Sequence, residues 1–117
     1  MNRKLAIALA QKNPVCKLQK FCAVLYVNNK TYYGFNKYEV HPLQVKYGRN
    51  PQSIHLHAEI DAIVNALSNG ETPLTLKGAS MFVARVFRSG RPALAKPCPG
   101  CWVALAAFGI NDVEWTQ

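Results

Sequence analysis

The sequence predicts a mixed α/β fold, in which one sheet carries helices on its faces. Two observations lead to this prediction. Short apolar runs alternate with segments of helical periodicity, and the order reads helix, strand, strand, helix, strand, helix, strand. Strand–helix–strand repeats of this kind call for a mixed sheet with helices packed against it. The chain has 117 residues, half of them hydrophobic, so we expect one domain over residues 1–117.

The first part of the chain predicts a helix and a β-hairpin. Residues 3–12 repeat apolar side chains at helical spacing until Pro14 ends the pattern. Residues 21–27 form a nearly continuous apolar run, which is typical of a strand covered on both faces. A polar turn at 28–30 leads into residues 31–35, which we expect to return as the partner strand.

The middle of the chain predicts a long loop and a second helix. Residues 36–53 contain proline and glycine and show little periodicity, so an irregular loop is expected there. Such a long loop in a small domain is usually functional or disordered. From Ile54 the apolar side chains recur at helical spacing, and Gly70 follows the end of the helix near Leu67.

The last third predicts two strands and a third helix. Residues 79–87 are β-branched and aromatic at their centre, as expected of a strand, and a second loop begins at Arg88. Pro99 suits the first turn of a helix. Residues 112–115 then form a short last strand. With the hairpin, this gives a sheet of four strands.

The charge of the chain favours a partner that carries phosphate. There are 14 Lys and Arg residues against 6 Asp and Glu, a net charge of +8. A nucleotide or a nucleic acid would meet such a surface favourably. The alternative is that the basic surface serves only to keep the protein in solution.

The sequence gives no reason to place the protein in a membrane. No apolar run is long enough to span a bilayer. The basic start followed by residues 5–10 superficially resembles a signal peptide, but no convincing cleavage site follows, and an amphipathic helix explains it better. We therefore expect a cytoplasmic protein, in which a C-x-x-C pair serves metal or redox chemistry rather than a disulfide.

A metal site is predicted from two motifs that open two of the helices. His57 begins His-Ala-Glu, and Cys98 and Cys101 form a C-x-x-C pair. Each motif is weak alone, but together they supply three ligands for tetrahedral zinc and leave a fourth position for water. A closed structural site remains the alternative, with His41 or His55 as a fourth ligand. Helix N-termini stabilise thiolates, which favours metal binding at the pair.

Glu59 is the candidate for proton transfer. It lies two residues beyond His57, so its carboxylate can approach the same centre without being a ligand. A carboxylate there can take a proton from the attacking water and deliver it to a ring nitrogen and a leaving amine. Hydrolytic deamination needs these components.

The pattern H-x-E followed by P-C-x-x-C resembles that of the cytidine and deoxycytidylate deaminase superfamily. The resemblance extends from about residue 21 to residue 115 and includes the order of the elements. It implies a three-layer α/β/α fold, a Zn²⁺ cofactor and a homo-oligomer. The matching positions are the metal ligands His57, Cys98 and Cys101 and the catalytic Glu59.

The resemblance also suggests residues that meet the substrate. Ala58 would offer a backbone group to the base, and Asn36 matches an asparagine that contacts sugar or base, although a turn residue at a strand end explains Asn36 equally well. Lys96 departs from the family pattern, which usually has Glu or Ser there. The sequence ends at Gln117, where members usually continue into a fifth strand, so either the sheet is shorter or a partner subunit covers its edge.

Two basic segments are candidates for the rest of the substrate. Aromatic residues interleave with cations in the first loop, and four cations precede the cysteines, an arrangement suited to bases and phosphates. For tyrosines nearest the strand, packing is the preferred interpretation. The candidates are Tyr38, Lys46, Tyr47 and Arg49 in the first loop and Arg85, Arg88, Arg91 and Lys96 in the second.

The favoured function is deamination of a free cytosine nucleotide or nucleoside, such as dCMP or deoxycytidine. The alternative is a deaminase of cytosine or adenine in single-stranded DNA or RNA, which the net charge favours. A minor alternative is a zinc-stabilised binding module without catalysis, in which Glu59 would have no evident purpose. Other bases, such as guanine or a pterin-like ring, also remain open.

Overall fold

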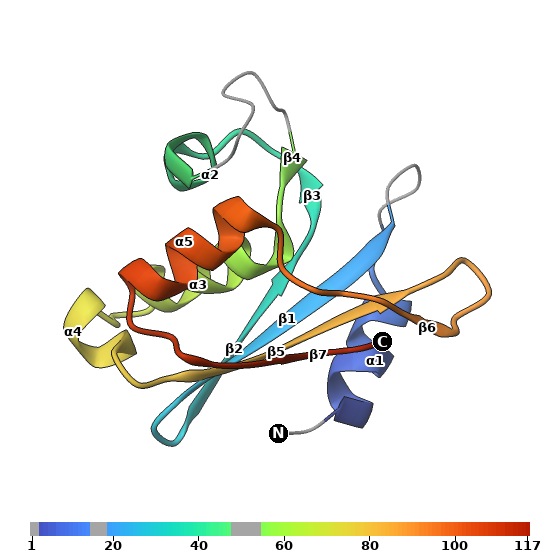
Figure 1. The fold of residues 1–117 in the computed structure, drawn as a ribbon, viewed down its shortest axis with the longest axis horizontal. Coiled ribbons are helices and arrows are strands. Elements are labelled where there is room, and N and C mark those ends of the chain that lie inside the picture. Colours follow the sequence, from blue (N-terminus) through green and yellow to red (C-terminus); the bar gives the residue numbers. More distant parts are fainter. Residues whose placement is uncertain (1–2, 15–18, 48–54) are drawn as a thin grey trace.

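The predicted helices and strands are present in the structure. The computed structural model describes residues 3–14, 19–47 and 55–117 (Figure 1). Five strands form the main sheet, in the order β2-β1-β5-β6, with β7 also paired to β5. Their bounds are β1 (Lys20–Val27), β2 (Lys30–Phe35), β5 (Ser80–Val86), β6 (Pro92–Ala93) and β7 (Asp112–Trp115).

The main sheet is mixed, as predicted. Strand β1 runs antiparallel to β2 on one side and to β5 on the other, so that Leu25 lies between Tyr32 and Met81. Strand β7 runs parallel to β5, whereas β6 pairs antiparallel with the last residues of β5. The sheet has five strands rather than the predicted four, because the two-residue β6 is too short to leave a periodic pattern in the sequence.

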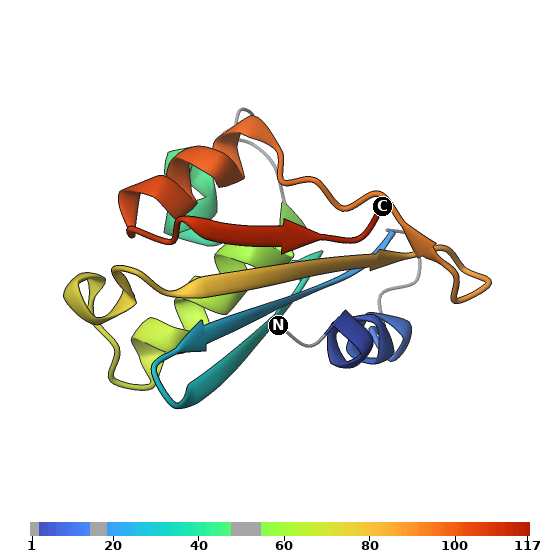
Figure 2. The same cartoon turned by 60° about the horizontal axis from the view of Figure 1, so that its bottom comes forward.

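Helices cover both faces of the sheet, which gives the predicted three layers (Figure 2). Helix α1 (Arg3–Gln11) lies on one face, and α3 (Ala58–Ser68) and α5 (Pro99–Ala107) lie on the other. The side chains of β1 alternate accordingly: Val24 packs with α1, and Leu25 packs in the core beneath α3. No helix of the described residues is long and apolar enough to cross a membrane.

The loop predicted over residues 36–53 is regular in its described part, so that prediction is wrong there. A two-stranded ribbon pairs β3 (Lys37–Tyr38) with β4 (His55–Leu56), and α2 (Pro42–Tyr47) lies between them along the chain. These elements are too short to show a period, and pairing between distant residues orders them. A further short helix, α4 (Pro73–Leu76), follows α3.

Helix α3 lies unusually close to β2, and Gly34 makes this approach possible. A Cβ atom at Gly34 would lie 2.1 Å from the Ala58 carbonyl oxygen and 2.3 Å from the Ala62 nitrogen. The buried Asp61 carboxylate accepts a hydrogen bond of 2.9 Å from the Phe35 backbone N–H, which fixes the same contact. The start of α3, where the predicted His-Ala-Glu motif lies, is thus positioned by the end of β2.

We expect Gly34→Ala to be strongly destabilising, by about 3 kcal/mol, because the new methyl group would meet helix backbone that cannot rotate away. Chemical denaturation followed by circular dichroism measures this loss. Gly70→Ala is the matched control, since Gly70 has a positive φ of 97° but open space around it. The control loses only about 1–2 kcal/mol from backbone strain. Equal stability of the Gly34→Ala variant and the wild type would contradict the close approach.

Candidate metal centre and active-site cavity

Both predicted motifs lie at helix N-termini. His57 is the N-cap residue of α3, and Cys98 is the N-cap residue of α5, with Pro99 in the first turn. The Cys98 sulfur accepts a hydrogen bond of 3.5 Å from the Cys101 backbone N–H. The partial positive charge of the helix start therefore acts on this sulfur and favours its thiolate form.

The three predicted ligands come together at one point. His57 Nδ1 lies 3.3 Å from Cys101 Sγ and 3.6 Å from Cys98 Sγ, and all three ligand atoms lie within 4.8 Å of one another. Zinc bonded tetrahedrally to nitrogen and sulfur places such atoms about 3.5–3.8 Å apart. Two sulfurs and one imidazole nitrogen are also the donor types that zinc prefers. The residues present therefore fit a zinc ion.

The ligand group has three members among the described residues, which favours the open site over the closed one. No other described His, Cys, Asp or Glu joins it. His41 Nδ1 instead accepts a hydrogen bond of 3.1 Å from the Leu43 backbone N–H at the start of α2. The His55 ring packs edge-on against Tyr38, with 5.2 Å between ring centroids. Neither His41 nor His55 therefore places a ligand atom in the group.

The two cysteines differ sharply in acidity. Hydrogen bonds from the Cys101 thiol and from His57 lower the pKa of Cys98 to about 3. The hydrogen bond to Cys98, together with burial, raises the pKa of the Cys101 thiol. The hydrogen bond to Cys98 raises the pKa of His57 as well. Hydrogen bonds from Cys101 and His57 thus favour the thiolate form of Cys98, the form of cysteine that binds metal ions.

Glu59 is buried beside the cluster, with 5% of its surface exposed. Burial raises the pKa of its carboxyl group above the ordinary range. It does not belong to the ligand group, and it lines the same cavity as His57 and Cys98. A carboxyl group whose pKa is raised in this way is suited to accepting and releasing a proton during a reaction.

A cavity of about 460 Å³ opens above this centre. That volume accommodates a small planar ring with a substituent. Its wall is formed by the start of β1, the end of β2, strand β4, the start of α3 and the segment before α5. The lining residues are Gln19, Phe21, Asn36, His55, Leu56, His57, Ala58, Glu59, Lys96 and Cys98.

Asn36 lines the cavity, and its side-chain amide is hydrogen-bonded to neighbouring residues. Its Oδ1 accepts hydrogen bonds from Asn13 Nδ2 at 2.7 Å and from the Phe21 backbone N–H at 3.0 Å. Its Nδ2 donates to the Gln19 carbonyl oxygen at 2.5 Å. The buried Asn13 is a residue that sequence reasoning missed. Because the oxygen of Asn36 already accepts two hydrogen bonds, only its amide nitrogen has a further hydrogen to offer a ligand.

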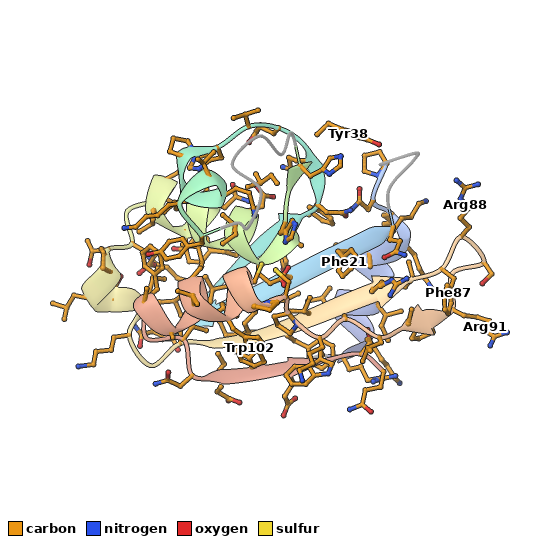
Figure 3. The ribbon with its side chains drawn as sticks, turned by 45° about the horizontal axis from the view of Figure 1, so that its top comes forward. Phe21, Tyr38, Phe87, Arg88, Arg91 and Trp102 are labelled. Carbon is orange, nitrogen blue, oxygen red and sulfur yellow. The ribbon has the colours of Figure 1, made fainter. Side chains whose placement is uncertain are left out.

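The other predicted substrate residues are distributed unevenly. Ala58 and Lys96 line the cavity, and none of the remaining described candidates does. Tyr38 is exposed at the β3–β4 ribbon (Figure 3). On α2, Lys46 Nζ lies 5.3 Å from the Tyr47 ring centroid. Tyr47 itself packs against the hydrophobic cluster that contains Ile60. Arg85, Arg88 and Arg91 belong to β5 and the turn after it. Arg49 lies outside the described residues.

Gln44 on α2 is a second residue that the sequence did not indicate. It is buried, and its Oε1 accepts a hydrogen bond of 2.9 Å from the His57 backbone N–H. This contact fixes the residue that carries the first ligand and docks α2 against the metal centre. The only signal in the sequence is a neutral amide in a short segment, which is too common to be informative.

We expect Gln44→Leu to weaken zinc binding by about 10- to 100-fold, the usual effect of losing a group that orients a ligand. Gln44→Glu keeps the accepting oxygen and should bind zinc much more tightly than Gln44→Leu. Val45→Ala is the control, because Val45 is exposed on the same helix. Competition with a chromophoric chelator measures the affinities. Equal affinities for Gln44→Leu and Val45→Ala would show that the contact does not position His57.

Solved structures of known proteins share this fold. A dCMP deaminase from the cyanophage S-TIM5 superposes with a TM-score of 0.64 at 21% identity, covering 98% of this chain and 84% of that one. The same enzyme in complex with dCMP and dUMP gives a TM-score of 0.64 at 24% identity, over 96% and 75% of the two chains. A cytidine deaminase from Burkholderia pseudomallei gives 0.63 at 21%, over 93% and 78%. At these identities the likeness shows the fold. A search of curated proteins found no match.

The family is shown by a match along the sequence itself. The model of the cytidine and deoxycytidylate deaminase zinc-binding region matches residues 2–117. That match includes the three residues whose ligand atoms the structure brings together. The expected Zn²⁺ cofactor is thereby confirmed, and the chain belongs to the cytidine and deoxycytidylate deaminase family.

Proposed function

We propose that the protein hydrolyses the exocyclic amine of cytosine in a free nucleotide or nucleoside, such as dCMP or deoxycytidine, and releases ammonia. One observation carries the proposal: the buried Glu59 carboxyl and the His57, Cys98 and Cys101 cluster meet in one cavity. The complex of the cyanophage enzyme with dCMP and dUMP supports a cytosine nucleotide as substrate. In this proposal residues 1–117 act as one catalytic domain.

The reaction follows from the placement of the chain's own groups. His57, Cys98 and Cys101 would hold zinc, which supplies Lewis-acid chemistry that lowers the pKa of a water molecule towards neutrality. Glu59 takes a proton from the attacking water while the oxygen of that water bonds to C4 of the cytosine ring. It then passes the proton to the adjacent ring nitrogen. Glu59 then carries the second proton to the amine, so that the C4–N bond breaks with release of ammonia and uracil remains.

Ammonia release from zinc-loaded protein tests the proposal. The assay runs in parallel on dCMP, deoxycytidine, CMP and a cytosine-containing single-stranded oligonucleotide. Turnover of one or more of the free compounds is the expected result, and loss of absorbance by the cytosine ring provides a second readout. Absence of turnover on every substrate, with one zinc bound per chain, would overturn the proposed activity.

Deamination within single-stranded nucleic acid is the second candidate. Its support is the net charge of +8 together with the exposed Phe87, Arg88 and Arg91 beyond the end of β5. A polynucleotide substrate would require several phosphate contacts, and its affinity should fall steeply with salt, with a slope of about −0.7 per contact. Turnover of the oligonucleotide alone, with that salt dependence, would replace the first candidate by the second.

We also propose that the protein is a homo-oligomer assembled through α5. The helix contains no charged residue, yet Val103 is 59% exposed, and Leu94, which directly follows β6, is 55% exposed. A helix that is apolar on all sides is usually covered. Light scattering after size-exclusion chromatography should give the mass of more than one chain, and Val103→Glu should reduce it. Ala8→Glu, on the opposite face of the sheet, should not; a monomeric wild type would refute the assembly.

A further inference from the structure

We propose that Arg85 forms a phosphate subsite beside the cavity, so that the substrate is a cytosine compound that carries phosphate. The inference rests on the proposed deaminase activity and narrows its substrate class. It is drawn from three features of the structure: the side of the sheet on which Arg85 lies, the absence of a carboxylate partner, and a second cation at the cavity.

Arg85 lies on the same side of the sheet as the cavity. It is the direct antiparallel neighbour of Phe21, which lines the cavity wall. Directly opposed residues of two adjacent strands share a face. The arginine Cζ lies 5.8 Å from the Phe21 ring centroid and 5.8 Å from the Phe87 ring centroid. One aromatic residue, Phe21, thus lies next to the guanidinium and also lines the cavity where the base would bind.

The charge of Arg85 has no carboxylate partner among the described residues. The ion pair found in the described ranges joins Lys37 to Asp61. Arg85 Nη1 donates to the Leu94 carbonyl oxygen at 3.1 Å, and its Nε is buried without a hydrogen-bond partner. A half-buried cation without an anion is unfavourable unless a ligand supplies the anion. The flat guanidinium matches the oxygens of a phosphate group.

A second cation approaches the cavity from the same segment. Lys96 lines the cavity, and it follows by two residues the Leu94 carbonyl that Arg85 holds. Arg88 and Arg91 project outward from the turn after β5, farther from the cavity (Figure 3). The geometry therefore assigns the first phosphate to Arg85 and Lys96. Arg88 and Arg91 are placed to contact a further phosphate if the substrate is a single-stranded nucleic acid.

The test compares kcat/KM for dCMP and for deoxycytidine, which differ only by the phosphate. We expect the wild type to favour dCMP, and Arg85→Gln to reduce that ratio by about 10- to 100-fold, as for the loss of a charge-assisted hydrogen bond. Arg85→Lys keeps the charge and should retain part of the preference. Arg3→Gln removes a matched charge from α1, on the opposite face of the sheet, and should leave the ratio unchanged.

A short single-stranded oligonucleotide distinguishes the two sources of phosphate. The quantity compared is kcat/KM for each phosphorylated substrate divided by kcat/KM for deoxycytidine. If Arg85→Gln lowers this ratio for dCMP, the ligand is a phosphate monoester. If it lowers the ratio only for the oligonucleotide, the ligand is a backbone phosphodiester, and either result supports the subsite. Equal reduction of dCMP and deoxycytidine turnover by Arg85→Gln would overturn it, because the residue would then only support the fold. The subsite would also be overturned if the wild type had the same kcat/KM for deoxycytidine as for the two phosphorylated substrates. That result would leave the deaminase activity intact. The reaction products dUMP and deoxyuridine test binding without turnover: we expect the wild type to be inhibited by dUMP but not by deoxyuridine.

Discussion

Replacing Glu59 by glutamine is expected to reduce the rate of deamination by about 10²- to 10⁴-fold, the contribution of a well-placed proton-transfer group. The amide has nearly the same shape and cannot exchange the protons that the reaction moves. Glu59 is buried and is not one of the grouped ligand atoms. The variant should therefore keep its zinc and its fold. Because burial raises the pKa of Glu59, a neutral amide at this position should also leave stability unchanged or higher.

Asp61 provides a matched control for this prediction. It is a second buried carboxylate on the same helix, but it accepts a hydrogen bond from the Phe35 backbone N–H and pairs with Lys37 Nζ at 3.0 Å. Asp61→Asn should lower stability and keep the rate per folded, zinc-loaded molecule within a few-fold of the wild type. Steady-state kinetics, metal analysis and thermal denaturation separate the two effects. Wild-type turnover by Glu59→Gln would remove Glu59 from the mechanism.

The metal centre could be predicted from the sequence because its geometry is local to two helix starts. Cys101 lies three positions after Cys98, so that once Cys98 is the N-cap of a helix, Cys101 lies one turn further on the same side. His57 has the corresponding place at the start of α3. Apolar periodicity indicated the first of these helices, and Pro99 indicated the start of the second. The approach of the two helices to each other depends on the fold, and the sequence indicated it only through the two motifs taken together.

The residues that support the centre could not be predicted in this way. Gln44 and His57 are 13 residues apart, and Asn13 and Asn36 are 23 apart. Each pair is joined by a hydrogen bond between polar groups that have no periodic pattern and no particular spacing. The short elements α2 and β3 are ordered by such long-range contacts rather than by their own propensities. Sequence patterns record local structure, and these contacts are not local.

The cations before the cysteines show the same difference. In the sequence Arg85, Arg88, Arg91 and Lys96 form one basic cluster. In the structure, the pairing of β1 with β5 places Arg85 beside Phe21, and the turn carries Arg88 and Arg91 outward (Figure 3). Lys96 alone among them lines the cavity. The sequence showed that these four residues are basic. Which of them lie near the cavity and which point outward depended on the register of the strands.

Cys98→Ser is expected to abolish stable zinc binding and, with it, the activity. Hydrogen bonds from Cys101 and His57 lower the pKa of the Cys98 thiol to about 3, so that it is a thiolate at neutral pH. A serine hydroxyl stays protonated at neutral pH and is a poor zinc ligand. The loss of affinity should exceed the 10- to 100-fold expected from removing a supporting group such as Gln44. Metal analysis after dialysis against a weak chelator measures the remaining zinc.

Cys22→Ser shows whether the effect belongs to the site or to any cysteine. Cys22 is fully buried between the sheet and α1, and burial raises the pKa of its thiol to about 12. Its replacement by serine buries a hydroxyl in an apolar layer and should lower the thermal stability. It should nevertheless keep one zinc per folded chain, because Cys22 lies outside the ligand group. Full zinc retention by Cys98→Ser, or zinc loss by Cys22→Ser at a temperature where the protein remains folded, would contradict the assignment of the metal to α3 and α5.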